Sequence, residues 1–226
     1  MRNMTLQAIA KAVGGKLYNG QGYENITTKG VVIDSRQVEE GYLFIAIKGE
    51  RVDGHNFVED VLNKGALAVV SEKELDIEKP YILVDSSTEA LKDMAKHYRD
   101  NLDVKLIGIT GSVGKTSTKE FIAAVLAEKY SVLKTEGNFN NEIGLPLTIL
   151  KIRDHHEIAV IEMGISHFGD MKPLGIIANP DICVITNIGY SLIIKRVFLH
   201  KCPRAKLCFD VYIAIWVKIL CVFFNK

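Results

Sequence analysis

Over residues 1–190, short apolar runs alternate with segments whose apolar residues recur every three or four positions. Such runs are typical of buried strands, and the helical spacing between them predicts helices that cover the sheet. In the first hundred residues, strands are predicted at 31–33, 42–47, 67–70 and 81–84, and helices at 6–13, 57–62 and 87–99. These elements predict a compact α/β domain at residues 1–100.

A second unit is predicted at residues 101–190. Its predicted strands are residues 104–109, 158–161 and 182–185. Buried strands that alternate with helices form parallel sheets, which bind ligands at the carboxyl ends of their strands. Thr110, Glu162 and Asn187 each follow a predicted strand, so we expect them to share one rim of the sheet.

The charge is distributed unevenly along the chain. The formal net charge of +1 favours no nucleic-acid partner, but residues 1–190 carry 21 basic and 26 acidic residues, whereas residues 191–226 carry seven basic residues and one acid. The latter segment is also apolar at 24 of its 36 positions. Its longest apolar block, residues 211–224, is shorter than the ~20 residues that span a bilayer. We expect an atypical tail that does not complete the fold, with a segment lying on a membrane surface as the less favoured alternative.

The N-terminus and the cysteines favour a cytoplasmic protein. Gln7 and Lys11 interrupt the first apolar residues, so no secretory signal is expected, and Thr5 instead suits the N-cap of a helix. The cysteines at 183, 202, 208 and 221 show no Cys-x-x-Cys spacing and no disulfide framework.

The strongest chemical motif is GITGSVGKTSTKE at residues 108–120, between a predicted strand and a predicted helix. A glycine-rich turn in this position cradles phosphate oxygens with backbone N–H groups. Lys115 would contact the β- and γ-phosphates of ATP, and the Thr116 hydroxyl would bind Mg²⁺. The common pattern has glycine where Ile109 stands, so a chance glycine-rich turn is the alternative. The predicted cofactor-binding residues are Gly111, Ser112, Val113, Gly114, Lys115, Thr116 and Ser117.

These patterns together predict the fold class. It is α/β, with a small N-terminal α/β domain followed by part of a P-loop (Rossmann-like) parallel-sheet ATPase domain.

Two further features would lie near the phosphate loop. Glu162 closes the predicted strand in IAVIEMG and is a candidate metal ligand, with an exposed acid at the strand end as the alternative. The loop TEGNFNNEIGLP offers Asn138, Asn140 and Asn141, which could line a reaction centre or only form a turn.

Cationic residues also follow strands of the first domain. Arg36, Lys48, Arg51 and His55 would suit an anionic ligand, although surface charge alone would explain them. The histidine pair in DHHE, residues 154–157, is interpreted as a solvated loop rather than a metal cluster.

The motifs resemble those of the Mur ligases, the ATP-dependent enzymes that build the peptide of peptidoglycan. The similarity rests on DSR, LFIAIKGERVDGHNF and GALAVV, then GITGSVGKTSTKE, TEGNFNNEIGLPLT, IEMG and PDICVITNIG, in this order. The asparagine loop and GSVGKTSTKE look most like those of the member that joins D-Ala-D-Ala to UDP-MurNAc-tripeptide, and the resemblance covers residues 1 to about 190.

The resemblance implies a reaction in which ATP phosphorylates the terminal carboxylate of UDP-MurNAc-tripeptide and the amine of D-Ala-D-Ala attacks the acyl phosphate. It implies that Ser35, Arg36 and Lys48 hold the uridine nucleotide. Thr116 and Glu162 would bind Mg²⁺. The implied catalytic residues are Lys115, Glu162, Asn138 and Asn141, and a monomer is expected.

The chain departs from the family pattern after Gly189. Tyr190, Ser191 and Leu192 stand where members have a small residue, a histidine that helps to bind a second metal, and a leucine. The later lysine that is carbamylated in the family, the contacts to adenine and the C-terminal domain are not found in the sequence. We therefore expect a truncated or frame-disrupted member that cannot complete ligation. The alternatives are a non-catalytic remnant that binds a UDP-sugar or another nucleotide, and an unrelated P-loop kinase.

Overall fold

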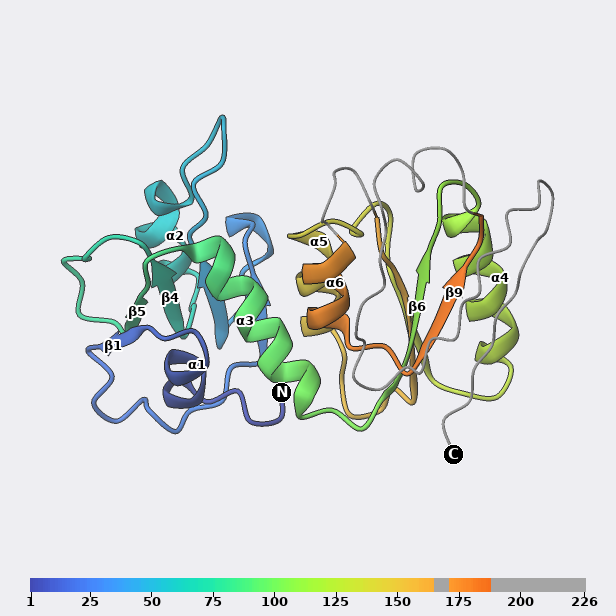
Figure 1. The fold of residues 1–226 in the computed structure, drawn as a ribbon. Coiled ribbons are helices and arrows are strands. Elements are labelled where there is room, and N and C mark those ends of the chain that lie inside the picture. Colours follow the sequence, from blue (N-terminus) through green and yellow to red (C-terminus); the bar gives the residue numbers. More distant parts are fainter. Residues whose placement is uncertain (165–170, 188–226) are drawn as a thin grey trace. The chain divides into compact units, whose positions relative to one another are not determined.

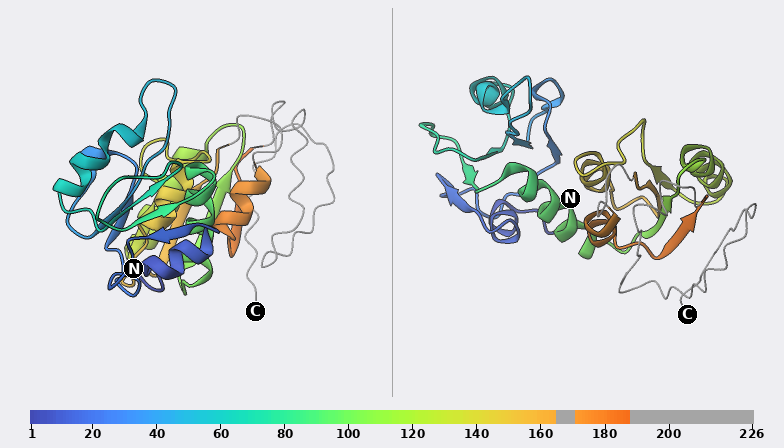
Figure 2. Two further views of the ribbon diagram at one scale, coloured as in Figure 1. Left: turned by 90° about the vertical axis from the view of Figure 1, so that its left-hand side faces the viewer. Right: turned by 45° about the horizontal axis from the view of Figure 1, so that its top comes forward.

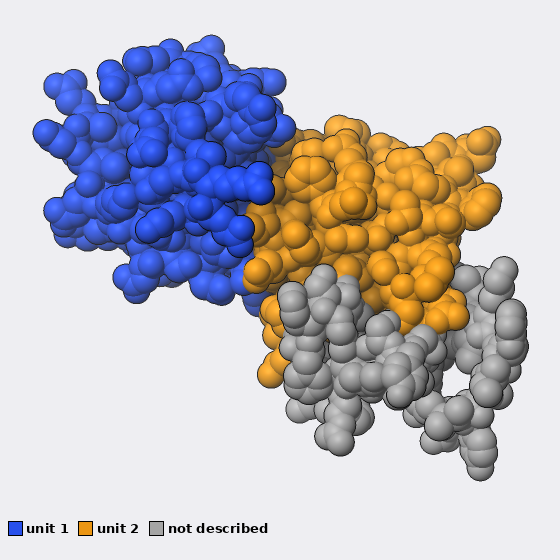
Figure 3. All heavy atoms as spheres, turned by 90° about the horizontal axis from the view of Figure 1, so that it is seen from above, with its two compact units in different colours: residues 1–102 blue, residues 103–226 orange. Residues whose placement is uncertain are grey.

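The computed structural model describes residues 1–164 and 171–187, and these form two compact units (Figure 3). The first unit is residues 1–102, and the second begins at Asp103. The predictions made for residues 188–226, including the atypical tail, lie outside the described residues. Within the described part of the chain, no helix is both long enough and apolar enough to cross a membrane.

A five-stranded sheet forms the centre of the first unit (Figure 1). Its order is β1-β5-β4-β3-β2, in which only the edge strand β1 is antiparallel to its neighbour. Four of the strands confirm the predicted apolar runs, whereas β1 was not predicted because it is short and half-exposed. The strands are β1 (Lys16–Tyr18), β2 (Gly30–Val32), β3 (Tyr42–Ile45), β4 (Ala68–Ser71) and β5 (Tyr81–Leu83).

The helices of the first unit confirm the predicted periodicity. The Thr5 hydroxyl caps the first helix by accepting from Ala8 N–H, and Gly14 follows it with a φ of +63°. Val58 and Val61 pack into the same apolar cluster as Phe44 of β3. The elements are α1 (Leu6–Ala12), α2 (Val58–Asn63) and α3 (Ser87–Asp100), with short 3₁₀ turns η1 (Ser35–Gln37) and η2 (Gly54–Phe57).

In the second unit a four-stranded parallel sheet has the order β7-β8-β6-β9. Helix α4 lies on one face of this sheet, and α5 and α6 lie on the other (Figures 1 and 2). The strands are β6 (Lys105–Thr110), β7 (Val132–Lys134), β8 (Ile158–Glu162) and β9 (Ile182–Ile185). The helices are α4 (Lys115–Ala127), α5 (Gly144–Leu150) and α6 (Met171–Ala178).

Strand alternation decides which side chains face α4. Ile107, Ile109 and Val160 pack with Ala123 of α4 in one apolar cluster. Because side chains alternate along a strand, Glu162 lies on the same face as Val160, two positions further on. The Glu162 carboxylate therefore lies on the face of the sheet that α4 covers, near the start of that helix.

The inward face of α4 carries a lysine as well as apolar residues. Phe121 and Val125 are 74% and 73% exposed, whereas Ile122 and Leu126 pack against the apolar cluster of the sheet. The fully buried positions are Lys119 and Ala123. The helix prediction is confirmed, and a lysine is buried on the inward side of this helix.

Candidate active site

The turn between β6 and α4 has the backbone of a phosphate cradle. Gly111 and Gly114 have φ values of +143° and +86°, a region that residues with side chains rarely adopt. A Cβ at Gly111 would also overlap the Thr186 hydroxyl. Glycine is required at this position, because the chain after β9 passes directly against the loop.

The end of β9 fastens this loop on one side. The Thr186 hydroxyl donates to the Val113 carbonyl at 2.6 Å, and Ser112 N–H donates to the Asn187 carbonyl at 3.0 Å. Ser112 N–H, which was expected to reach phosphate, is thus bonded within the protein. The first helical hydrogen bond of α4 runs from Thr118 N–H to the Gly114 carbonyl. The N–H groups of residues 115–117 precede this bond, and such amides at the start of a helix can bind an anion.

Lys115 lies at the start of α4 and folds back over the loop. Its ammonium group donates to the Gly111 carbonyl at 2.8 Å and is partly buried. This contact holds a positive charge against the loop, next to the first amides of α4. The arrangement fits a phosphate group carrying more than one negative charge.

Glu162 is the centre of a hydrogen-bonded group at the end of β8. It is only 2% exposed, and each of its carboxylate oxygens accepts a bond from a different element. Thr116 of α4 donates to Oε2 at 3.0 Å, and the Asn140 amide donates to Oε1 at 2.9 Å. The structure therefore brings together the two predicted metal ligands, Thr116 and Glu162, and adds Asn140.

The three asparagines of the loop have different surroundings. Asn140 contacts Glu162, and its carbonyl also accepts from Gly164 N–H at 2.7 Å. The Asn141 side chain caps the start of α5 by accepting from Ile143 and Gly144 N–H, at 3.2 and 2.8 Å. Asn138 is exposed, and its carbonyl accepts from Asn140 N–H. The predicted catalytic residues include Asn138 and Asn141 but not Asn140, because the three amides are chemically equivalent in the sequence and only the fold shows which one contacts Glu162.

A metal at this position would need ligands from the nucleotide. Among the described residues, no group of three or more His, Cys, Asp and Glu side chains could hold a metal ion. A hydroxyl, one carboxylate and phosphate oxygens suit Mg²⁺, which is commonly held by one or two protein carboxylates and substrate phosphates.

The predicted substrate residues of the first unit lie beyond the carboxyl ends of β2 and β3. Arg36 is exposed and donates from Nε and Nη2 to both oxygens of Asp34, at 2.9 and 2.6 Å. These bonds lower the pKa of the Asp34 carboxyl to about 2. The Ser35 carbonyl accepts from the Lys64 ammonium group. Lys48 is exposed, and its backbone forms an isolated antiparallel bridge with that of Asp53.

His55 is not available as a cationic ligand. Its side chain is 5% exposed, and its Nε2 accepts from Glu72 N–H at 3.1 Å. Nδ1 must then carry the proton that is donated to Asp53 at 2.6 Å. The expectation that His55 contributes to an anion site is therefore wrong, because one ring nitrogen donates to Asp53 of the same loop and the other accepts from Glu72, which follows β4.

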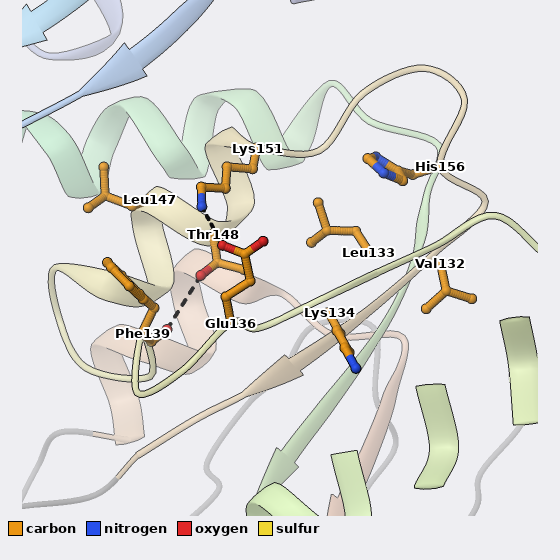
Figure 4. A pocket seen from close by; sticks show the side chains of 9 residues that line it. All are labelled: Val132, Leu133, Lys134, Glu136, Phe139, Leu147, Thr148, Lys151 and His156. Atoms are coloured by element: carbon orange, nitrogen blue, oxygen red, sulfur yellow. Dashed lines mark hydrogen bonds and ion pairs between the residues drawn. The ribbon is translucent and has the colours of Figure 1, made fainter. Parts of the chain in front are cut away.

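A pocket of about 250 Å³ lies between β7, α5 and the asparagine loop, which lines it with Glu136 and Phe139 (Figure 4). Lys151 pairs with Glu136 at 2.7 Å and lies over the Phe139 ring. No residue of the phosphate loop lines this pocket, so it is distinct from the phosphate cradle. Its lining residues are Val132, Leu133, Lys134, Glu136, Phe139, Leu147, Thr148, Lys151 and His156.

Comparison with known families accounts for both units. Residues 27–99 match the Mur ligase family catalytic domain, and residues 109–191 match the Mur ligase middle domain. The chain belongs to the Mur ligase family. The middle-domain match contains the phosphate loop, Glu162 and the asparagine loop.

Relatives of this Mur ligase chain are named UDP-N-acetylmuramoyl-tripeptide--D-alanyl-D-alanine ligase. The chain is 48% identical over 194 residues to that of Bacillus subtilis, and the match covers 84% of this chain and 42% of the relative. The Escherichia coli relative is 35% identical over 189 residues, covering 84% of this chain and 41% of the relative. The chain thus spans less than half the length of these relatives.

Solved structures agree with the architecture of this Mur ligase chain. MurF from Acinetobacter baumannii matches with a TM-score of 0.75 at 36% identity, covering 82% of this chain and 41% of that one. MurF from Thermotoga maritima, solved in complex with ADP, matches with a TM-score of 0.66 at 40% identity, covering 78% of this chain and 41% of that one. The α/β fold class with parallel sheets is confirmed.

Proposed function

We propose that the second unit binds ATP and Mg²⁺ for an ATP-dependent ligase reaction that joins D-Ala-D-Ala to UDP-MurNAc-tripeptide. The observation that carries this proposal is the meeting of Thr116 and Asn140 on the two oxygens of a buried Glu162, beside Lys115. The names of the relatives supply the substrates. We also infer a cytoplasmic monomer, as expected for an enzyme that uses ATP and a UDP-linked precursor.

The residues present fit a magnesium–nucleotide. Gly111 and Gly114 give the loop the positive φ values that a tight glycine-rich turn requires, and the first amides of α4 favour an anion. The Thr116 hydroxyl and the Glu162 carboxylate are hard oxygen ligands of the kind Mg²⁺ requires. Bound ATP would supply the phosphoryl group that makes a carboxylate reactive toward an amine.

The chain's own side chains would act mainly through charge and position. Lys115 would exchange its bond to the Gly111 carbonyl for phosphate oxygens and offset their charge. Asn140 would keep Glu162 oriented while the carboxylate serves the metal. Asn138 and Asn141 remain candidates for lining the reaction centre, Asn138 through its exposed side chain and Asn141 by shaping the start of α5.

The first unit is proposed to hold the uridine-nucleotide end of the substrate. Ser35 and Arg36 follow β2, and Lys48 follows β3, its parallel neighbour. Carboxyl ends of neighbouring parallel strands meet at one rim, so these groups can share an anionic ligand. Arg36 would have to share its guanidinium between that ligand and Asp34.

A second candidate function is nucleotide binding without ligation. The sequence after Gly189 favours it, because Tyr190, Ser191 and Leu192 stand where the family has its histidine. The two candidates share the phosphate site and differ in whether product forms.

Calorimetric titration with a non-hydrolysable ATP analogue and Mg²⁺ tests the site, and phosphate release with both substrates tests ligation. We expect Lys115→Ala to abolish nucleotide binding, while the matched Lys129→Ala, an exposed lysine beyond the end of α4, keeps it. Equal affinity in the wild type and Lys115→Ala would refute the proposed site. Product formation would exclude the second candidate.

A further inference from the structure

A lysine is buried in the helix that follows the phosphate loop. Lys119 is 1% exposed and lies in the inward stripe of α4, where an aliphatic side chain would be expected. Its ammonium group donates to the Thr135 carbonyl at 2.7 Å and lies 3.2 Å from Glu120 Oε1. Burying an ammonium group is costly unless its partners are specific.

Thr135 connects this lysine to the candidate metal ligand. It is fully buried between β7 and the asparagine loop, and its N–H donates to the Val160 carbonyl of β8 at 3.0 Å. Its hydroxyl accepts from Glu162 N–H at 2.9 Å. The backbone of Glu162 is therefore held by the same residue whose carbonyl accepts from Lys119.

These bonds close a ring through the site. Lys119 contacts Thr135, Thr135 holds Glu162, and Glu162 accepts from Thr116. Thr116 and Lys119 lie three residues apart on α4, which places them on the same side of the helix. One element thus carries both a candidate metal ligand and the group that fixes the opposite ligand.

We propose that Lys119 is a positioning residue, which through Thr135 holds Glu162 and the base of the asparagine loop in register with Thr116. It touches neither nucleotide nor metal in this role. The inference rests on the proposed magnesium–nucleotide site. It adds Lys119 as a residue that changes how nucleotide binding depends on Mg²⁺.

Neutralisation of Glu120 does not account for the position of Lys119. Glu120 is about half exposed and also pairs with Lys134 at the surface. A surface acid with a second cationic partner does not require a fully buried lysine. The contact that needs Lys119 to be buried is the one to Thr135.

The test compares Lys119→Met with Lys129→Met, which removes an exposed lysine beyond the other end of α4. Binding of the non-hydrolysable ATP analogue is titrated over a range of Mg²⁺ concentrations and without Mg²⁺. We expect Lys119→Met to raise the Mg²⁺ concentration for half-maximal binding about tenfold, as for other residues that orient metal ligands, with metal-free affinity unchanged. An unchanged Mg²⁺ dependence in a folded Lys119→Met overturns the proposal.

Thr135→Val provides a second variant, because it removes the hydroxyl that accepts from Glu162 but leaves the carbonyl for Lys119. Because both substitutions weaken the same support of Glu162, their effects on the Mg²⁺ concentration for half-maximal binding should be non-additive in the double variant. Additive effects overturn the proposal where both single variants fold, and a Thr135→Val protein with wild-type Mg²⁺ dependence overturns it even if Lys119→Met does not fold.

Amide exchange separates this inference from the proposed function. Lys119→Met should speed hydrogen exchange at Glu162 N–H in the nucleotide-free protein, with Lys129→Met unchanged. If the wild type binds no nucleotide, the proposed function fails and this inference fails with it. If the wild type binds and only the variant comparison shows no difference, this inference alone fails.

Discussion

The Asn140 side chain donates a 2.9 Å hydrogen bond to Glu162, whose other carboxylate oxygen accepts from Thr116. Glu162 therefore receives neutral donors from the asparagine loop and from the phosphate-loop helix. A buried carboxylate held in this way is oriented before a cation arrives. Of the three loop asparagines, Asn140 is therefore the one that orients the candidate metal ligand Glu162.

Asn140→Ala should weaken Mg²⁺-dependent nucleotide binding. The substitution leaves one oxygen of a buried carboxylate without its donor, so the side chain loses its fixed orientation. We expect a roughly tenfold to hundredfold rise in the Mg²⁺ concentration for half-maximal binding, measured by calorimetry. Asn138→Ala should have a smaller effect, and a larger effect from Asn138→Ala would reverse the assignment.

Gly111→Ala should disrupt the phosphate loop. Alanine would be strained at a φ of +143°, and its Cβ would overlap the Thr186 hydroxyl. We expect a loss of about 1–3 kcal/mol in the free energy of unfolding together with loss of nucleotide binding. Denaturant unfolding and nucleotide titration measure the two effects.

Gly175→Ala is the matched control, since it adds the same methyl group within α6, where nothing lies within 4 Å. It should stabilise the protein by roughly 0.5–1 kcal/mol, as expected for replacing a helical glycine. Equal destabilisation by both variants would contradict the strain argument.

Arg36→Ala should change both ligand binding and the titration of Asp34. Without the guanidinium, the pKa of Asp34 should rise from about 2 toward its ordinary 3.8, which NMR can follow. A depressed carboxyl pKa stabilises the fold fully above the ordinary value and loses that contribution as the pH falls through about 2. The stability difference between the wild type and Arg36→Ala should therefore shrink between about pH 4 and pH 2.

The same Arg36→Ala variant should bind the uridine-nucleotide substrate more weakly than the wild type. Lys11→Ala, which removes a lysine from the last turn of α1, is the control. Unchanged substrate affinity in Arg36→Ala would remove Arg36 from the proposed substrate site, whatever the pKa of Asp34 does.

His156 should make the second unit less stable in mild acid. Burial lowers the pKa of His156, helped by the charges of His155 and Arg153, and its Nδ1 accepts from Arg153 N–H. Protonation would break that bond. Because the folded state binds this proton less readily than the unfolded state, stability is full above the ordinary pKa of 6.5 and falls as the pH drops below it.

Thermal unfolding at a series of pH values measures this effect. His156→Gln should flatten the decline between about pH 7 and pH 5, whereas His97→Gln, in α3 of the first unit, should not. A decline of equal steepness in the wild type and His156→Gln would assign the acid sensitivity to other groups.

The pattern of apolar residues predicted most of the elements because burial acts locally on each of them. Val31, Phe44 and Val160 lie in strands where their apolar neighbours placed them, and Thr5 caps the helix it was expected to cap. Strand β1 escaped prediction, since it gains its structure from pairing with β5 rather than from its own apolar pattern. Helical periodicity likewise does not reveal which side of α4 meets the sheet: Phe121 and Val125 are exposed, whereas Ile122 and Leu126 pack against the core.

The sequence by itself determined the phosphate loop, with Lys115 and Thr116, because glycine spacing and the flanking strand and helix are local features. Only the tertiary structure decided that Asn140 contacts Glu162, that His55 is held between Asp53 and Glu72, and that Lys119 is buried. Each of these depends on which strands lie side by side and which face a helix turns inward. Chemically identical side chains acquire different roles from contacts that join distant parts of the chain.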